Sequence, residues 1–220
     1  VVDGFFDDLA REAEGRLREF QGQGLVNLAW AFAKTGRYDE QLFAALEAEL
    51  ERRGAGGLEP QEVSNTVWAF ATVGHSAPRL FDKLVVAMGP LLPRCNAQEL
   101  ANIAWAYATA GGPRSAFEPV ANEALKRSGE FTPQGLANLA WAFVTALCRA
   151  EDCAIALDGV DAAGGGGGGG VGLAAAGEDG NRNVDGRPPW LNELLDFLAA
   201  ESRAQLHSFS SEQSFAILAW

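Results

Sequence analysis

One set of polar and aromatic residues recurs in the same order four times along the chain. Its first copy consists of Gln23, Asn27, Trp30 and Lys34, which follow one another at intervals of four, three and four residues. On an α-helix these intervals place the four side chains on one face. Amides both donate and accept hydrogen bonds, and an indole offers a flat surface for stacking. The set is therefore suited to binding a ligand that has planar and hydrogen-bonding groups.

The polar members of this stripe are the candidate binding residues. They are Gln23, Asn27, Lys34, Gln61, Asn65, Thr72, Gln98, Asn102, Thr109, Gln134, Asn138 and Thr145. Two interpretations remain open. In one, the tryptophans pack between neighbouring repeats, and the asparagines satisfy backbone carbonyls or indole N–H groups across that contact. In the other, the stripe lines a concave groove, where amides read base edges and aromatic rings stack on bases.

Two positions beside the stripe vary from copy to copy. The residue after the glutamine is Gly24, Glu62, Glu99, Gly135 or Ser214, and the residue before the asparagine is Val26, Ser64, Ala101 or Ala137. A selective readout requires variation within a constant frame, so these positions are further candidates. Solvent exposure alone also produces such variation.

The stripe belongs to a longer word that we predict to be the first helix of a two-helix repeat. The words are QGLVNLAWAFAKTG at 23–36, QEVSNTVWAFATVG at 61–74, QELANIAWAYATAG at 98–111 and QGLANLAWAFVTAL at 134–147, with a truncated QSFAILAW at 213–220. The tryptophans of the four complete words lie 38, 37 and 36 residues apart. Asn96 and Thr132 are typical N-caps, and glycines at 36, 74 and 111 are typical helix ends. Apolar residues at helical spacing, such as Leu42, Phe43 and Leu46, predict a second, amphipathic helix after each word.

This pattern predicts an all-α fold, an α-solenoid of helical hairpins with a repeat of about 36–38 residues. Residues 1–148 comprise a partial repeat, repeats one to three and the first helix of repeat four. Residues 149–187 include seven consecutive glycines and are expected to form a disordered, acidic Gly/Ala-rich insertion rather than a domain boundary. Residues 188–220 supply the second helix of repeat four and the truncated repeat five. Because both ends fall inside repeats, we expect the chain to belong to a longer array.

Composition argues against catalysis and against a membrane protein. Three cysteines without CxxC spacing and only two histidines disfavour a disulfide framework and a metal site. Cys148 and His75 fall in different repeats, and no third residue is placed to orient them. We therefore predict no enzyme activity, no catalytic residues, no metal, no cofactor and no small-molecule substrate. No apolar run is long enough for a transmembrane helix, and no signal or targeting peptide is visible.

The net charge of −12 disfavours nucleic acid as a partner without excluding it. Residues 22–148 carry a net charge of only −2, because most of the acidic excess lies in the flanks and the insertion. Cations near the turns between helices are expected to form a local positive strip: Lys34, Arg37, Arg79, Lys83, Arg94 and Arg114. With so few cations, we expect weak binding with a shallow salt dependence.

The repeat words resemble a known group of helical repeats. NLAWAFAKTG, NTVWAFATVG, NIAWAYATAG and NLAWAFVTAL resemble octotricopeptide repeats. They look equally like the leucine-rich repeats of FAST-kinase-like and RAP-domain proteins, and like repeats of the RNA-editing substrate-binding complex. Ile217 replaces the asparagine in the fifth word and departs from the pattern. Nothing in the sequence matches a RAP domain, so the resemblance carries no kinase or nuclease site onto this chain.

The resemblance implies an RNA-binding protein of mitochondrial or chloroplast RNA processing, stability or translation. Its expected partner is single-stranded RNA, held in a groove of first helices at about one nucleotide per repeat. The alternative is a protein-interaction scaffold of armadillo/HEAT-like type, whose concave face holds a peptide or a partner helix. The acidic balance of the chain suits a basic protein partner.

Overall fold

The computed structural model of the chain describes residues 2–54, 57–127, 129–148 and 189–204, and all regular structure in them is helical. The α-helices are α1 (Val2–Glu14), α2 (Gly22–Lys34), α3 (Glu40–Arg53), α4 (Pro60–Val73), α5 (Pro78–Met88), α6 (Ala97–Ala110), α7 (Phe117–Ala124), α8 (Pro133–Cys148) and α10 (Pro189–Ala204). Short 3₁₀ turns are η1 (Leu17–Glu19), η2 (Gly89–Arg94) and η3 (Arg114–Ala116). The all-α prediction is confirmed. The predicted insertion at 149–187 and repeat five at 213–220 lie outside the described residues.

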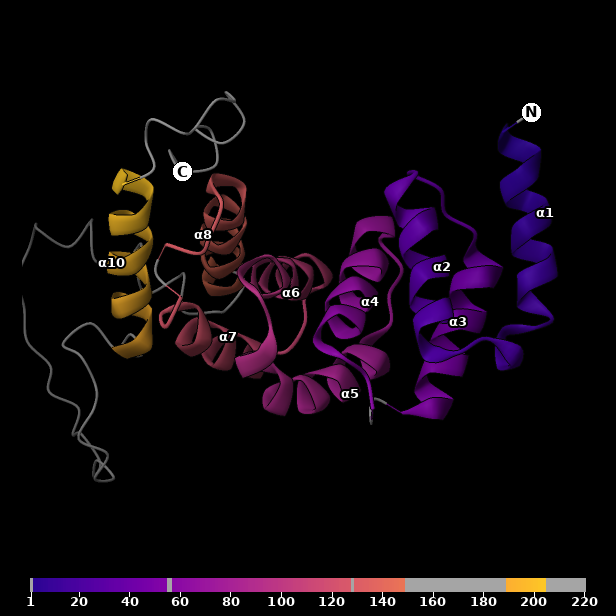
Figure 1. Cartoon of the computed structure of the whole chain (residues 1–220), viewed down its shortest axis with the longest axis horizontal. Helices are drawn as coiled ribbons and strands as arrows, with labels where there is room; N and C mark the ends of the chain where they lie inside the picture. Colours follow the sequence, from indigo (N-terminus) through magenta and orange to yellow (C-terminus); the bar gives the residue numbers. More distant parts are fainter. Residues whose placement is uncertain (1, 55–56, 128, 149–188, 205–220) are drawn as a thin grey trace, which may run out of the picture.

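The helices form two layers along a curved molecule (Figure 1). Helices α2, α4, α6 and α8 pack side by side in one row, and we call them the inner helices. Helices α1, α3, α5, α7 and α10 are the outer helices, and α3 contacts both α1 and α5. Each inner helix begins 38, 37 or 36 residues after the one before it. The sequence period is therefore the period of the helical hairpins, as in an α-solenoid.

Inner helices begin at the capping residues that the sequence indicates. The Asn96 side chain accepts a hydrogen bond from the Glu99 backbone N–H at 2.9 Å, and the Glu99 carboxylate accepts one from the Asn96 N–H at 2.8 Å. This pair is the predicted capping box of α6. Thr132 Oγ1 accepts from the Gly135 N–H at 3.1 Å and caps α8 in the same way.

The first three inner helices end in the same turn. Gly36, Gly74 and Gly111 adopt left-handed φ angles of 67°, 71° and 69°. The N–H of the residue after each glycine then donates to a carbonyl in the last helical turn; these bonds are Arg37 to Phe32, His75 to Phe70 and Gly112 to Tyr107. This is the Schellman motif, in which glycine avoids the strain of a left-handed residue. The chain therefore leaves each of these helices in the same direction, toward its outer helix.

The residues after Gly36 and Gly74 also join consecutive repeats. The Arg37 guanidinium lies 4.8 Å from the centre of the Phe6 ring on the preceding outer helix. His75 takes the same place one repeat later and lies 5.9 Å from the Phe43 ring. Its ring nitrogens contact the Tyr38 hydroxyl at 3.0 Å and the Glu47 carboxylate at 3.1 Å. These contacts fix each inner-helix turn against the outer helix of the repeat before it.

In the third repeat, different residues make the contact between the inner helix and the outer helix of the preceding repeat. Tyr107 replaces the phenylalanine of the other inner helices, and its buried hydroxyl donates to the Phe81 carbonyl at 3.0 Å. Gly112 stands where His75 stands in repeat two. A Cβ atom at Gly112 would lie 2.5 Å from the Tyr107 ring, which is too close for any side chain. Glycine at 112 is therefore required by the position of the Tyr107 ring, whose Cδ1 atom the Cβ would meet.

The core lies between the two layers. Leu25, Leu28 and Phe32 of α2 are all buried against the outer helices. Helix α10 packs on α7 and α8, where the Trp190 ring contacts Phe143 at 5.8 Å. This puts α10 in the position of the outer partner of α8.

The outer helices of repeats one and three each carry a buried glutamate that forms an ion pair with an arginine four residues later. We call this pair the ion-paired clamp. In α3, Glu49 is buried and accepts hydrogen bonds from Arg52 at 2.7 and 2.8 Å and from Arg53 at 2.7 Å. Arg53 also donates to the Leu17 carbonyl of the preceding repeat at 3.0 Å. The clamp thus satisfies a carbonyl at the end of one repeat with a side chain from the next.

The clamp has a pH signature. Hydrogen bonds from Arg52, and then from Arg53, lower the pKa of Glu49 from 4.5 to about 2, although burial opposes the shift. A carboxylate with a lowered pKa stabilises the folded state above its unfolded pKa, and this contribution is lost as the pH falls toward the folded value. As the pH falls from about 5 to about 2, we expect the free energy of unfolding to decrease less in a Glu49→Gln variant than in the parent. Urea titrations at each pH measure this, with exposed Glu118→Gln as control; parallel pH curves for parent and Glu49→Gln would contradict it.

Candidate nucleic-acid interface

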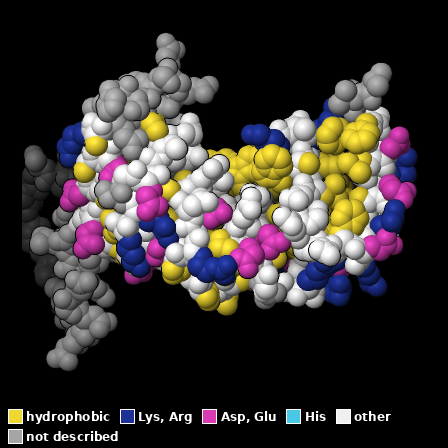
Figure 2. Space-filling model, in the orientation of Figure 1, with side chains coloured by type: hydrophobic (Ala, Val, Ile, Leu, Met, Phe, Trp, Pro, Cys, Tyr) yellow, Lys and Arg dark blue, Asp and Glu magenta, His cyan; other side chains and the backbone are white. Residues whose placement is uncertain are grey.

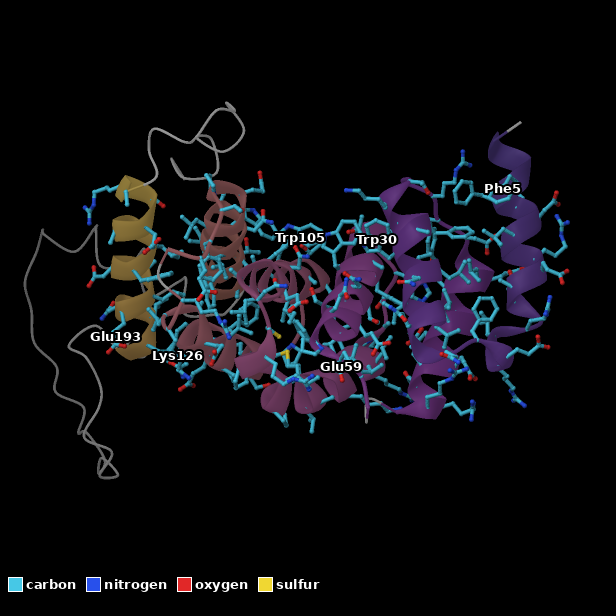
Figure 3. The ribbon with its side chains drawn as sticks, in the orientation of Figure 1. Phe5, Trp30, Glu59, Trp105, Lys126 and Glu193 are labelled. Carbon is cyan, nitrogen blue, oxygen red and sulfur yellow. The ribbon has the colours of Figure 1, made fainter. Side chains whose placement is uncertain are left out.

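Four tryptophans lie along the inner helices at the hollowed edge of the molecule. We call Trp30, Trp68, Trp105 and Trp141 the indole row. Trp30 and Trp141 are 39% and 37% exposed, while Trp68 and Trp105 are partly buried against the core. Figure 2 shows hydrophobic side chains gathered along this edge, where the outline of the molecule dips between its two ends. Figure 3 shows Trp30 and Trp105 at the same edge, on the side away from α5 and α7.

The indoles contact one another in pairs. The ring centres of Trp30 and Trp68 are 6.5 Å apart with a tilt of 39°, and those of Trp105 and Trp141 are 6.4 Å apart with a tilt of 34°. The packing interpretation is therefore correct in part, because the rings do meet across repeats. It is incomplete, because Trp30 and Trp141 keep more than a third of their surface exposed.

The asparagines beside the indoles are not used to hold the repeats together. Asn27 is exposed, and Asn65 and Asn102 are half-buried. Within the described residues, none of these three side chains makes a hydrogen bond in the structure, and none has a fully buried polar atom. Asn138 does accept a hydrogen bond, at 2.9 Å, from Gln134 of its own helix. The bonds across repeats that the packing interpretation requires are thus missing from this part of the chain.

The glutamines lie at the N-terminal end of the same face. Gln23, Gln61, Gln98 and Gln134 are all exposed. The bond from Gln134 to Asn138 joins the two amides of one repeat and leaves the other polar atom of each to face solvent. The two amides of a repeat can therefore present one donor and one acceptor side by side.

The last member of the stripe differs among the repeats. Lys34 and Thr72 are exposed, and Thr145 is half-buried. The Thr109 hydroxyl is buried and has no hydrogen-bond partner in the described structure. It lines a cavity of about 330 Å³ between the turns that follow α4 and α6. A ligand on the surface would meet Lys34 or Thr72 but not the Thr109 hydroxyl.

Six of the variable positions beside the stripe are closed to a surface ligand, and a seventh, Ser214, lies outside the described residues. The four residues that precede the asparagines are buried to 1% exposure or less: Val26, Ser64, Ala101 and Ala137. Ser64 lies in the contact between α4 and α6, 3.5 Å from the Glu99 carbonyl, so no ligand can touch it without separating these repeats. Glu62 and Glu99 face inward to their own helix starts, where they accept from the backbone N–H groups of Glu59 and Asn96.

The expected strip of cations is partly neutralised. Lys83 forms an ion pair with Glu51 at 3.2 Å, and Arg94 forms a short one with Glu59. Arg37 lies over the Phe6 ring. On the described inner helices the only basic residue is Lys34, so the face that carries the indole row is close to neutral.

Other chemistry has little support in the described residues. They contain no group of three or more His, Cys, Asp or Glu side chains arranged to hold a metal ion. Burial raises the pKa of the Cys95 thiol to about 11, which keeps it protonated and unreactive near neutral pH. His75 is held between Tyr38 and Glu47 inside a repeat contact. The side chain of Cys148 and the whole of Cys153 lie outside the described residues.

Among the helices that are described, none has the length and apolar character needed to cross a bilayer. No protein-family model matches the chain, and the comparison with curated proteins found no match.

Proposed function

We propose that this chain binds single-stranded RNA along its inner helices. The observation that carries the proposal is the indole row flanked by Asn27, Asn65 and Asn102, whose amides make no hydrogen bond within the described residues. Single-stranded RNA exposes both the flat faces and the hydrogen-bonding edges of its bases. Indoles stack on the faces, and amides match the donors and acceptors of the edges.

The electrostatics indicate how such binding would work. Only Lys34 lies on the described inner helices, so few phosphates can be neutralised there. Stacking and amide contacts must then supply most of the affinity. Affinity would fall only slightly with salt, because the salt dependence scales with the number of phosphates neutralised.

The resemblance to octotricopeptide and FAST-type repeats supports RNA as the partner and suggests a role in mitochondrial or chloroplast RNA processing, stability or translation. An extended protein segment is the second candidate, and the near-neutral inner face favours it. Asparagine amides can also pair with a peptide backbone, and indoles can hold aliphatic side chains.

Substitution of the amides tests the proposal. A fluorescently labelled RNA of about 12 nucleotides is titrated with the 220-residue chain and with the triple variant Asn65→Ala/Asn102→Ala/Asn138→Ala. Each lost hydrogen bond costs about 0.5–1.5 kcal/mol, so we expect at least a tenfold loss of affinity. Circular dichroism should be unchanged, because Asn65 and Asn102 hold no hydrogen bonds within the described structure.

The matched control removes three amides from the outer helices. Gln41→Ala/Asn122→Ala/Asn192→Ala should bind RNA like the parent, since these residues belong to α3, α7 and α10. Equal losses in both triple variants, or no RNA binding by the parent even at low salt, would overturn the proposal. Binding of an extended basic peptide instead, lost in the inner-face variant, would favour the scaffold.

A further inference from the structure

The indole contacts alternate along the row. Trp30 meets Trp68, and Trp105 meets Trp141, in nearly the same geometry. No ring contact joins Trp68 to Trp105 in the described structure, although they stand on neighbouring helices just as the paired rings do. A uniform array would repeat the same contact at every junction. The row is therefore divided into two units, each spanning two repeats.

The junction between the units has its own polar contact. Ser64 is buried in the contact between α4 and α6, and its hydroxyl lies 3.5 Å from the Glu99 carbonyl. The corresponding residues of the other inner helices are Val26, Ala101 and Ala137, which cannot make this contact. The α4–α6 junction is thus distinguished both by the missing indole contact and by this polar contact.

Each pair combines an anchored ring with an accessible one. Trp68 and Trp105 pack against the hydrophobic core, so they hold their partners in place. Trp30 and Trp141 are the more exposed members, at 39% and 37%. An immobilised ring binds a flat ligand at a lower cost in side-chain entropy than a free one. The pair is therefore a better stacking surface than either ring alone.

We propose that the inner face carries two base-stacking platforms, Trp30–Trp68 and Trp105–Trp141, each formed by two repeats. This inference rests on the proposed RNA binding and adds that the unit of recognition is two repeats, not one. The ligand is a single strand whose bases stack on the platforms, while Asn27 and Asn65, or Asn102 and Asn138, contact base edges. The affinity comes mainly from the bases and only slightly from phosphates.

Double-mutant cycles on the full chain separate the two units. The paired cycle combines Trp30→Leu with Trp68→Leu, and the matched unpaired cycle combines Trp68→Leu with Trp105→Leu. Both cycles join neighbouring inner helices, and only the first joins two rings that are in contact. We expect Trp30→Leu to weaken RNA binding by about 5- to 100-fold, the usual range for loss of a stacked base.

The two cycles should differ in additivity. Within a platform, the double variant should lose little more than the worse single variant, because either substitution disables the unit. Across the junction, the two fold-losses should multiply. Trp30→Phe should recover most of the binding, because it keeps a stacking ring. If Trp68→Leu fails to fold by circular dichroism, Trp68→Met replaces it in both cycles, because methionine fills space in a core without supplying a ring.

Three results would overturn the inference, and they are distinguishable. If RNA binds and the fold-losses of the single variants multiply in both cycles, the two-repeat unit is contradicted, but RNA binding is not. Full affinity for an RNA whose bases are replaced by abasic sites would show phosphate binding without stacking. No binding of RNA, with binding of an extended peptide that Trp30→Leu abolishes, would remove both proposals. Phe5→Leu, an exposed aromatic on α1 outside the row, is the control and should bind like the parent.

Discussion

Replacing Phe43 with alanine is expected to lower the free energy of unfolding by about 3–5 kcal/mol. The Phe43 ring is fully buried, and it contacts the rings of Tyr38, Phe70 and His75 with centre distances of 5.6, 5.3 and 5.9 Å. These rings come from α3, from α4 and from the two turns that follow α2 and α4. Alanine would leave a cavity where repeats one and two meet, and a close-packed contact can fill it only in part.

Urea unfolding followed by circular dichroism measures this loss. The control is Phe5→Ala, whose ring is 62% exposed, and we expect it to change the stability by about 1 kcal/mol or less. Similar losses in the two variants would show that the aromatic contact between the repeats does not carry the stability assigned to it.

The helical hairpins could be predicted because local signals and the repeat agree. Asn96 and Thr132 cap the helices that follow them, and Gly36, Gly74 and Gly111 end the helices that precede them. These features act within one turn of the chain, so they are visible in the sequence. The regular period of the words then predicts that the hairpins stack in layers, since each hairpin must cover its apolar faces with a neighbour.

The exposed surface of the inner helices could be predicted less well. A helical wheel of one hairpin shows only which side chains face the partner helix of that hairpin. Within the described residues, α4 and α6 also have an inner helix on each side, and Ser64 and Ala101 on these two helices are buried. The Thr109 hydroxyl is buried, although its sequence position matches exposed Thr72. A wheel for an isolated hairpin therefore overstates the readable surface of a stacked repeat.

The pairing of the indoles could not be predicted from the sequence. The four tryptophans occupy equivalent positions in the words. The second word differs from the others at several positions, Ser64 among them, but the meaning of Ser64 depends on the Glu99 carbonyl that lies opposite. Contacts between repeats depend on angles of a few degrees, which residue types alone do not determine.

The clamp that the sequence analysis missed gives the second large prediction. In α7, buried Glu123 accepts hydrogen bonds from Arg127 at 2.9 Å and from exposed Lys126 at 3.1 Å. Arg127 also donates to the Pro93 carbonyl of the preceding repeat at 2.8 Å. The pairs Glu–Arg at this spacing are visible in the sequence, but their carbonyl acceptors more than thirty residues away are not.

Repeat two is a natural version of the chain without this clamp. Counting from the shared phenylalanine of the outer helices, Ala87 takes the place of Glu123 and Leu91 takes the place of Arg127. The surface there is an apolar cavity of about 640 Å³, lined by residues that include Leu58 and Val86. The fold therefore accepts either a complete ion pair or two apolar residues at this position.

A buried glutamate without its arginine should make the fold less stable than either the complete ion pair or two apolar residues. We expect Arg127→Leu to cost about 3 kcal/mol, because it leaves the buried Glu123 charge with only exposed Lys126 and leaves the Pro93 carbonyl unbonded. The double variant Glu123→Ala/Arg127→Leu should recover at least half of that loss, since it reproduces the pair of residues found in repeat two. Urea unfolding of the three proteins measures the recovery, with exposed Arg79→Leu as the control for removing a surface cation. A double variant less stable than Arg127→Leu would mean that Glu123 stabilises the repeat without its arginine, against the electrostatic argument for the clamp.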